Sequence, residues 1–178
     1  PDSGCQSFTK QITVSINSRD SVTNYLWDFG DGTTSTNARP NHTFSNLGYY
    51  NISVIGTTIN GCKDTTYISN AIRVTTKPTA NFSADIREGC AKTPIQFTNL
   101  STGATSYRWE FGDLSVSHEK NPKYRYSDTG WMTVTLVAMN GGCTDTIIFR
   151  KYIHIKPAVA KFMGSLKCSS PFVRSFVS

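Results

Sequence analysis

The 178-residue sequence has few charged residues and no long apolar run. Charged side chains make up 17% of it and hydrophobic side chains 38%, a balance typical of a globular chain and not of a disordered one. No eighteen consecutive residues are apolar, so the sequence predicts no membrane insertion. The opening PDSGC has neither the charge nor the apolar length of an export signal, and we expect any such signal to be absent from this sequence.

Motifs for metal binding and nucleophilic catalysis are also missing. The sequence has no C-x-x-C, its three histidines do not stand at metal-ligand spacing from the cysteines, and no serine lies in a G-x-S-x-G motif. We therefore predict no metal site, no cofactor and no catalytic residue, and we expect the chain not to be an enzyme.

The formal charge of +6 is unevenly distributed along the chain. The first 77 residues are nearly neutral, and the remainder carries most of the positive charge. Its cations are scattered and form no run, which is typical of a solvated surface. We accordingly expect no nucleic-acid partner.

The residues that are abundant favour an all-β fold. Thr, Ser, Val, Ile, Tyr and Phe recur in short alternating segments, separated by breaks with Gly, Asn or Pro. Such segments predict strands with one buried and one solvated face.

An internal repeat organises the sequence. YLWDFGDGTTS returns as YRWEFGDLSVS, so that Trp27 corresponds to Trp109, 82 positions later, and NGCKDTT returns as GGCTDTI. We predict one module at residues 1–77, a second at 78–157 and the N-terminal part of a truncated third at 158–178. Whether the first module lacks its first strand stays open. The short linkers TTKPT and IKPAV predict semi-rigid joints between modules.

The five cysteines follow the same repeat. Each module has one early and one late cysteine, and widely spaced cysteines in a β-rich chain favour disulfides in an oxidising compartment. We predict the bonds Cys5–Cys62 and Cys90–Cys143, with the partner of Cys168 beyond the sequence. The alternatives are a free Cys168 or a bond across modules, such as Cys62 to Cys90.

The repeated Trp-acid-Phe-Gly-Asp motif is interpreted as a folding device. Its aromatic residues share one face of a strand and are predicted to enter the core, while its second acid accepts hydrogen bonds from amides of the following turn. These residues are Trp27, Phe29 and Asp31 in the first copy, and Trp109, Phe111 and Asp113 in the second. The second copy has Leu114 where Gly32 completes the first turn, so this turn is expected to differ or to carry strain.

The acids of the first motif allow two other functions. Asp28 and Asp31 could form a carboxylate pair for acid–base catalysis, but no second catalytic group is implied nearby. They could also contribute to a calcium site, although the D-x-D-x-D-G spacing is absent.

Tyr49 and Trp131 are the candidate binding residues. Each follows a glycine shared by the two copies, and period-two alternation directs both side chains outward. We expect a neighbouring module or a long loop to cover Trp131. The alternative is an exposed surface that contacts a glycan or a protein partner.

The segments WDFGDG, PNHTF and GYYNISV, and in the second copy WEFGD, NPKYRY and GWMTVTL, resemble the polycystic kidney disease (PKD) domain pattern. The resemblance covers nearly the whole chain and implies tandem immunoglobulin-like β-sandwiches. The cysteines and the GC-x-D-T hairpin are similar to those of PKD arrays in large secreted or cell-surface proteins of bacteria.

The resemblance implies a non-catalytic extracellular segment, a stalk, spacer or adhesin shaft whose partners are neighbouring modules of the same chain. The alternative is a carbohydrate- or protein-binding module attached to a secreted hydrolase, with a polysaccharide or an extracellular protein as its partner.

Overall fold

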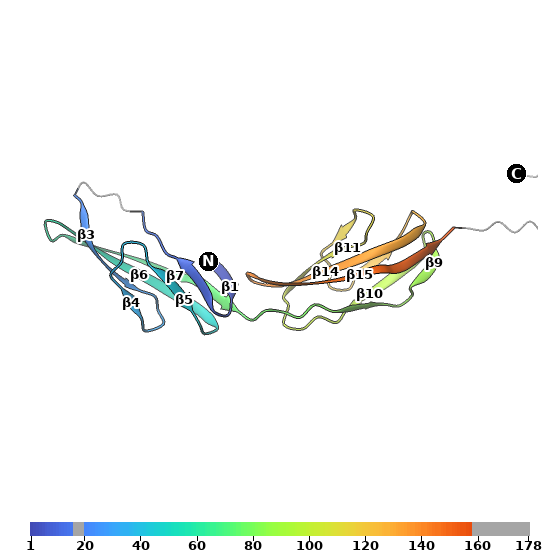
Figure 1. Cartoon of the computed structure of the whole chain (residues 1–178), viewed down its shortest axis with the longest axis horizontal. Coiled ribbons are helices and arrows are strands. Elements are labelled where there is room, and N and C mark those ends of the chain that lie inside the picture. The colour runs from blue at the N-terminus through green and yellow to red at the C-terminus, as the bar shows by residue number, and fades with distance from the viewer. Residues whose placement is uncertain (16–19, 158–178) are drawn as a thin grey trace, which may run out of the picture.

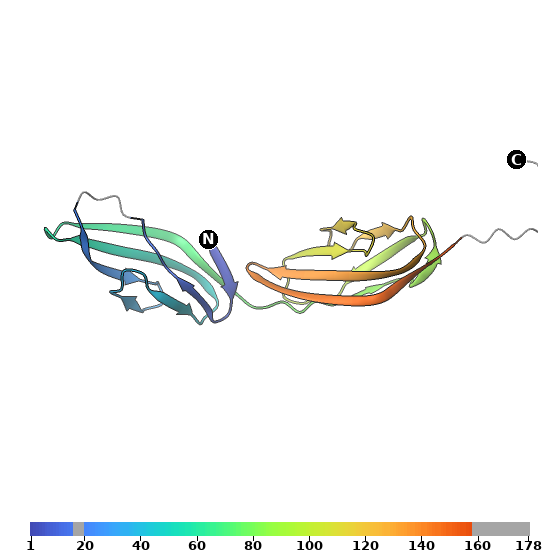
Figure 2. The ribbon, with the colours of Figure 1, turned by 45° about the horizontal axis from the view of Figure 1, so that its top comes forward.

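Two β-sandwich modules lie end to end in an elongated rod (Figures 1 and 2). The structure is a computed structural model that describes residues 1–15 and 20–157. These residues contain no helix, so none could cross a membrane. The predicted all-β class and the predicted tandem sandwiches are confirmed. The predicted third module lies outside the described residues, as does Cys168.

Each module has one large and one small sheet. The large sheet of the first module has the order β1-β7-β6-β3-β4, and its small sheet pairs β2 with β5. β6 shows the period-two burial of a strand with one buried face, whereas residues 63–70 of β7 are exposed on both faces. The strands are β1 (Asp2–Cys5), β2 (Phe8–Gln11), β3 (Val22–Asp28), β4 (Thr34–Ser35), β5 (Asn41–Phe44), β6 (Gly48–Thr58) and β7 (Lys63–Thr75).

The second module repeats this order, with β12-β11-β14-β15-β9 in the large sheet and β13-β10-β8 in the small one. The early strand of each module runs parallel to the last strand, β1 beside β7 and β9 beside β15. The strands are β8 (Phe82–Ala84), β9 (Glu88–Cys90), β10 (Pro94–Asn99), β11 (Ser106–Glu110), β12 (Val116–Ser117), β13 (Lys123–Arg125), β14 (Gly130–Asn140) and β15 (Cys143–Lys156).

Each module has a core of its own, centred on the tryptophan of the repeated motif. Trp27 is buried with Phe29, and Trp109 with Phe111. In the second module Phe82 of β8 closes the core with its ring centroid 5.1 Å from that of Trp109. Burial of such rings is the main source of stability in so thin a sandwich.

The described residues of the first module provide no counterpart of β8. In its place lies a cavity of about 380 Å³ that reaches Trp27. Its apolar lining includes Ile52 and Ile72 of the large sheet, and Ile12 and Val14 of the segment that follows β2. The described parts of the two modules therefore differ at this position of the core.

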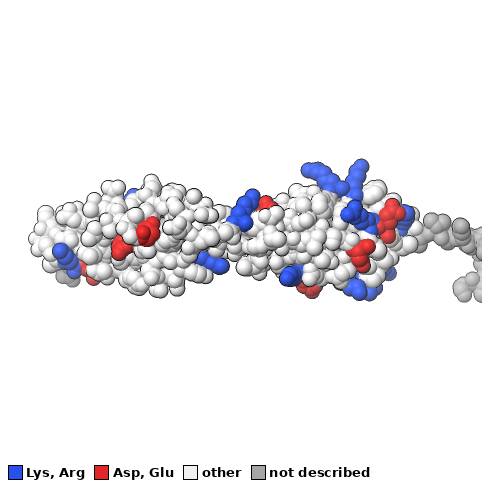
Figure 3. Space-filling view, turned by 90° about the horizontal axis from the view of Figure 1, so that it is seen from below, with Lys and Arg blue, Asp and Glu red and all other residues white. Residues whose placement is uncertain are grey.

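The cations on the face shown in Figure 3 lie mostly on the second module and are interspersed with carboxylates. Ion pairs join Arg108 to Glu110 and Lys156 to Glu88. The basic half of the chain therefore forms a mixed, solvated surface on this face, as the scattered cations predict.

Candidate functional site at the module junction

The repeated motif forms the same corner in both modules. The indole nitrogen of Trp27 donates to the carbonyl of Asn37 at 2.9 Å, and that of Trp109 donates to the carbonyl of Glu119 at the same distance. A ring stacks on the motif phenylalanine in each module, with 4.0 Å between centroids: His42 on Phe29, and Tyr124 on Phe111. The indole is thus buried with its one donor satisfied.

The second acid of the motif accepts hydrogen bonds from the turn, as predicted. Asp31 Oδ1 accepts from the amide of Thr33 at 3.0 Å, and Asp113 Oδ1 accepts from the amide of Ser115 at 3.0 Å. The other carboxylate oxygen holds the stacked ring, with 2.7 Å from Asp31 Oδ2 to Nε2 of His42. In the second module the hydroxyl of Tyr124 donates to Asp113 Oδ2, also at 2.7 Å.

Partial burial raises the pKa of Asp31, but the hydrogen bonds from Thr33 and His42 outweigh it and hold this pKa below its ordinary value. A carboxyl whose pKa is lowered on folding stabilises the fold above its unfolded pKa. That stabilisation is lost as the pH falls through the folded pKa.

Replacing Asp31 by alanine is therefore expected to destabilise the first module by about 1 kcal/mol at neutral pH, since only corner hydrogen bonds are lost. The loss of stability caused by Asp31→Asn should become smaller as the pH is lowered, because protonation of Asp31 removes the same stabilisation from the parent chain. Denaturant unfolding at several pH values measures both. A loss larger than that of Trp109→Ala would show that the motif is more than a folding device.

Carboxylate oxygens of Asp28 and Asp31, which a carboxylate pair or a calcium site would use, already accept hydrogen bonds within the corner. Asp28 Oδ1 accepts the amide of Gly30 at 2.8 Å, and both oxygens of Asp31 are engaged within the corner. Within residues 1–15 and 20–157, no group of three or more His, Cys, Asp or Glu side chains could hold a metal ion.

Leu114 adopts the conformation of the glycine that it replaces. Its φ is 71°, against 86° for Gly32, and its side chain is fully exposed. The turn therefore keeps its shape, and the left-handed backbone costs a leucine about 1–2 kcal/mol.

We expect Leu114→Gly to stabilise the second module by about 0.5–1 kcal/mol, because relief of this strain exceeds the added freedom of glycine in the unfolded chain. Gly32→Leu is the matched control and should destabilise the first module through backbone strain alone, because the φ of Gly32 is 86° while a Cβ there meets no atom within 4 Å. Hydrogen exchange resolves the two modules. A less stable Leu114→Gly variant would contradict the prediction.

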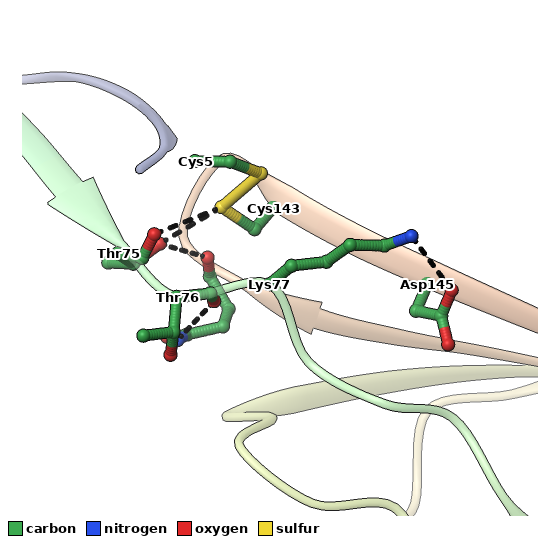
Figure 4. Close-up of a disulfide and its surroundings, with 7 residues drawn as sticks. Cys5, Thr75, Thr76, Lys77, Cys143 and Asp145 are labelled. Carbon is green, nitrogen blue, oxygen red and sulfur yellow. Dashed lines mark hydrogen bonds and ion pairs between the residues drawn. A yellow bond between two sulfur atoms is a disulfide. The ribbon is translucent and has the colours of Figure 1, made fainter. Parts of the chain in front are cut away.

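The disulfide joins the two modules instead of closing each one. Cys5 at the end of β1 is bonded to Cys143 at the start of β15, with their Cα atoms 5.2 Å apart (Figure 4). Cys62 and Cys90 are free and exposed. Both predicted pairings, Cys5–Cys62 and Cys90–Cys143, are therefore wrong, and so is the alternative bond between Cys62 and Cys90.

Strand direction explains the error. Cys5 pairs with Thr75 at the far end of β7, whereas Cys62 precedes Lys63 at its beginning. Twelve residues of strand at about 3.3 Å each separate these positions by roughly 40 Å, and a disulfide needs Cα atoms within about 7 Å. The two cysteines of one module thus lie at opposite ends of its sandwich.

Hydrogen bonds surround the disulfide at the junction (Figure 4). The Thr75 hydroxyl donates to the carbonyl of Asn140 at 2.7 Å and lies 3.3 Å from Cys143 Sγ, while the Asn140 side-chain amide donates to the carbonyl of Thr76 at 3.0 Å. Gly142 lies so close to β1 that a Cβ would be 2.1 Å from the carbonyl oxygen of Ser3. The hairpin of the second module is therefore packed against the end of the first.

Asp145 ties the linker to the second module. Its carboxylate accepts the amide of Ala80 at 2.8 Å and pairs with Lys77 at 3.2 Å. These contacts, the Ala80 amide foremost, hold the pKa of Asp145 below its ordinary value. The joint is thus restrained by a covalent bond, a carboxylate and backbone contacts, which agrees with the predicted semi-rigid linker.

The candidate binding residues Tyr49 and Trp131 point outward, as predicted, and are 57% and 53% exposed. Trp131 stacks on His154 with 4.3 Å between ring centroids, and the guanidinium of Arg73 lies 5.5 Å from the Tyr49 ring. Within residues 1–15 and 20–157 no loop or module covers Trp131. Cover by a module that begins at residue 158 stays a prediction, because that segment lies outside the described residues. The structure also does not bring Tyr49 and Trp131 together, because they lie on different modules.

Sequence reasoning missed the junction residues. Thr75, Asn140 and Gly142 lie in a linker-adjacent strand end and a hairpin, where no periodic pattern marks a contact. The repeated GC-x-D-T hairpin is the one signal that could have indicated them.

The architecture defines an immunoglobulin-like tandem β-sandwich. Fibronectin(III)-like modules of CbhA from Clostridium thermocellum share the fold, with a TM-score of 0.62 and 15% identity over 92% of this chain and 94% of theirs. The PKD domain family matches residues 2–74 and 75–150. The chain belongs to the PKD domain family.

Two bacterial collagenases contain similar segments. A microbial collagenase of Vibrio alginolyticus is 27% identical over 138 residues, which are 71% of this chain and 17% of that protein. Collagenase ColA of Bacillus cereus is 52% identical over 33 residues, which are 18% of this chain and 3% of that protein. The chain thus spans only a small part of either relative.

Proposed function

We propose that the chain is a non-catalytic extracellular spacer, a stalk or adhesin shaft within a larger secreted or cell-surface protein. Its modules span residues 1–77 and 78–157, and a third begins at 158. The observation that carries the proposal is the junction, where the Cys5–Cys143 bond fixes one module against the next. A spacer must keep a constant distance between its two ends. A cross-linked joint resists bending and so preserves that distance.

The chemistry of the junction supports this function. A disulfide persists in oxidising compartments outside the cytosol, and similarity to collagenase segments accords with a secreted bacterial parent protein. The short linker around Lys77 and Pro78 is held by Asp145 and leaves little chain free to swing.

Small-angle scattering tests the spacer function. We expect the oxidised chain to scatter as one extended rod with two modules in line. Cys5→Ser should broaden the distribution of inter-module angles, because the linker contacts alone then hold the joint. An oxidised chain as flexible as the Cys5→Ser variant would contradict the proposal.

The second candidate function is a binding module attached to a secreted hydrolase. It is favoured by Trp131, an exposed aromatic ring held in place by its stack on His154. Such preorganised rings bind sugar faces or protein side chains at low entropic cost. Collagen is a candidate ligand because the similar segments belong to collagenases.

Binding to fibrillar collagen and to insoluble polysaccharides, measured for the parent chain and for Trp131→Thr, separates the two functions. A binding module predicts a loss of at least tenfold in the variant, with Tyr49→Thr as the control on the other module. Equal binding by the parent chain and both variants would show that Trp131 does not contribute to binding, and the binding-module function would lose its main support.

A further inference from the structure

Among the described residues, the two free cysteines, Cys62 and Cys90, occupy the same positions in their modules as the two bonded ones. Cys5 pairs with Thr75 at the end of β7, and Cys90 pairs with Lys156 at the end of β15. Cys143 pairs with Asn140, the last residue of β14. Cys62 likewise faces the last residue of β6 across its hairpin, since its carbonyl accepts the amide of Thr58 at 2.9 Å.

The bonded and free cysteines differ in their exposure to solvent. Cys143 is completely buried because the first module covers it, whereas Cys62 and Cys90 are exposed. The hairpin between β6 and β7 lies at one end of the rod and β9 near the other (Figure 1). Each free thiol therefore stands at an end of the rod, where a further module would abut.

We propose that the Cys5–Cys143 bond is one instance of a cross-link that recurs at the junctions on either side of these two modules, within the array to which this chain belongs. Cys90 would bond to the hairpin cysteine of a following module, and Cys62 to the early cysteine of a preceding one. The partner surface in each case is the end of a second PKD module with the same cysteine positions. This inference rests on the proposed spacer function, which places the chain within a longer array.

Other features of the two ends fit such partners. Asp64 follows Cys62 by two residues, as Asp145 follows Cys143, and so can accept a linker amide as Asp145 accepts that of Ala80. Ile59, at the tip of the hairpin beside Cys62, is 72% exposed. A docked module would bury this apolar side chain.

The junctions would not be identical. Lys156 stands where Thr75 contributes its hydroxyl to the observed junction, and it pairs instead with Glu88 at 2.5 Å. The hairpin of the first module also has three residues, Ile59 to Gly61, where the second has Gly141 and Gly142. The contact between the Asn140 side chain and the linker carbonyl of Thr76 needs only backbone on the linker side, so it can recur.

Formation of each bond consumes one equivalent of a disulfide oxidant such as oxidised glutathione. A cysteine thiolate attacks this disulfide and releases one reduced thiol. The second cysteine then displaces the other, so two protein thiols become one disulfide as the oxidant is reduced to two thiols.

A three-module chain tests the proposal. Residues 1–156 are followed by a second copy of 76–157, which preserves the linker length of the observed junction. In the added copy, Cys90→Ser removes the last early cysteine, and Thr144→Ser marks the hairpin peptide by mass. After refolding in oxidised and reduced glutathione, peptide mapping is expected to find Cys90 of the middle module bonded to Cys143 of the added one, alongside Cys5–Cys143.

Cys62 should then remain free to alkylation. Cys90→Ser in the middle module is the matched control and should leave Cys143 of the added module free. Alkylation of Cys90, or a bond from it to Cys62, would overturn the proposal. If the cross-link is absent but scattering still shows an extended rod, the proposal fails and the spacer function stands; a three-module chain that is not extended contradicts the spacer function itself.

A second experiment uses the 178-residue chain without the added module. In a Cys168→Ser background, oxidation at high protein concentration is expected to yield head-to-tail oligomers joined through Cys90 of one molecule and Cys62 of the next. Cys62→Ser should abolish chains longer than a dimer. Head-to-head bonds between two Cys62 residues as the main product would overturn the proposal.

Discussion

Trp109→Ala is expected to destabilise the second module by roughly 3–5 kcal/mol, the usual cost of truncating a buried aromatic side chain. Trp109 is completely buried, and its ring lies 5.1 Å from Phe82 and 5.7 Å from Phe97 between centroids. The substitution leaves a cavity between the two sheets and also leaves the carbonyl of Glu119 without its indole donor.

Trp131→Ala is the matched control in the same module, because its ring is half-exposed and lies outside the core. It should cost under about 1 kcal/mol, the value of one surface ring stack. Hydrogen exchange on β14 and β15 measures both variants without a tryptophan signal. Equal losses for the two would contradict a core role for Trp109.

Gly30→Ala is expected to destabilise the first module by roughly 3 kcal/mol, the sum of a strained backbone and an overpacked contact. The φ of Gly30 is 73°, and a Cβ would lie 2.3 Å from the carbonyl oxygen of Asn51. That oxygen belongs to the backbone of β6 and cannot rotate away, as a side chain would. The motif thus needs a glycine here so that the corner can approach the sheet.

Gly32→Ala separates the cost of the strained backbone from the cost of the overpacked contact. Gly32 has a φ of 86°, but a Cβ there meets nothing within 4 Å, so its substitution should cost only about 1 kcal/mol. Hydrogen exchange on β3 and β6 compares the two variants in the first module alone. If Gly32→Ala proved as costly as Gly30→Ala, close approach to β6 would not be the reason for the glycine.

Much of this protein was determined by local sequence alone. Alternation of apolar and polar residues identifies the strands, because the side chains of a strand alternate between its two faces. The repeat at Trp27 and Trp109 predicts two modules with separate cores, and both tryptophans are buried. Asp31 and Asp113 were predicted to hold turn amides because an Asx-type bond spans only two residues, and both do so.

The partners of these acids across the corner depended on the second sheet. Nothing local indicates that His42 and Tyr124, eleven residues along the chain, stack on the motif phenylalanine and bond to the motif acid. Exposure of Trp131 likewise depends on where the neighbouring module lies. Period-two alternation orients this side chain but does not say what covers it.

The disulfide was decided only by the tertiary structure. The repeat shows correctly that each module has an early and a late cysteine, but not at which end of the sandwich each one lies. β1 pairs in parallel with the far end of β7, so Cys5 is carried away from Cys62 and toward the hairpin of the next module. Local patterns determine strands, faces and turns because these depend on near neighbours in sequence. The choice of Cys143 as the partner of Cys5, 138 residues away, depends on strand direction and on the way one module is stacked upon the next.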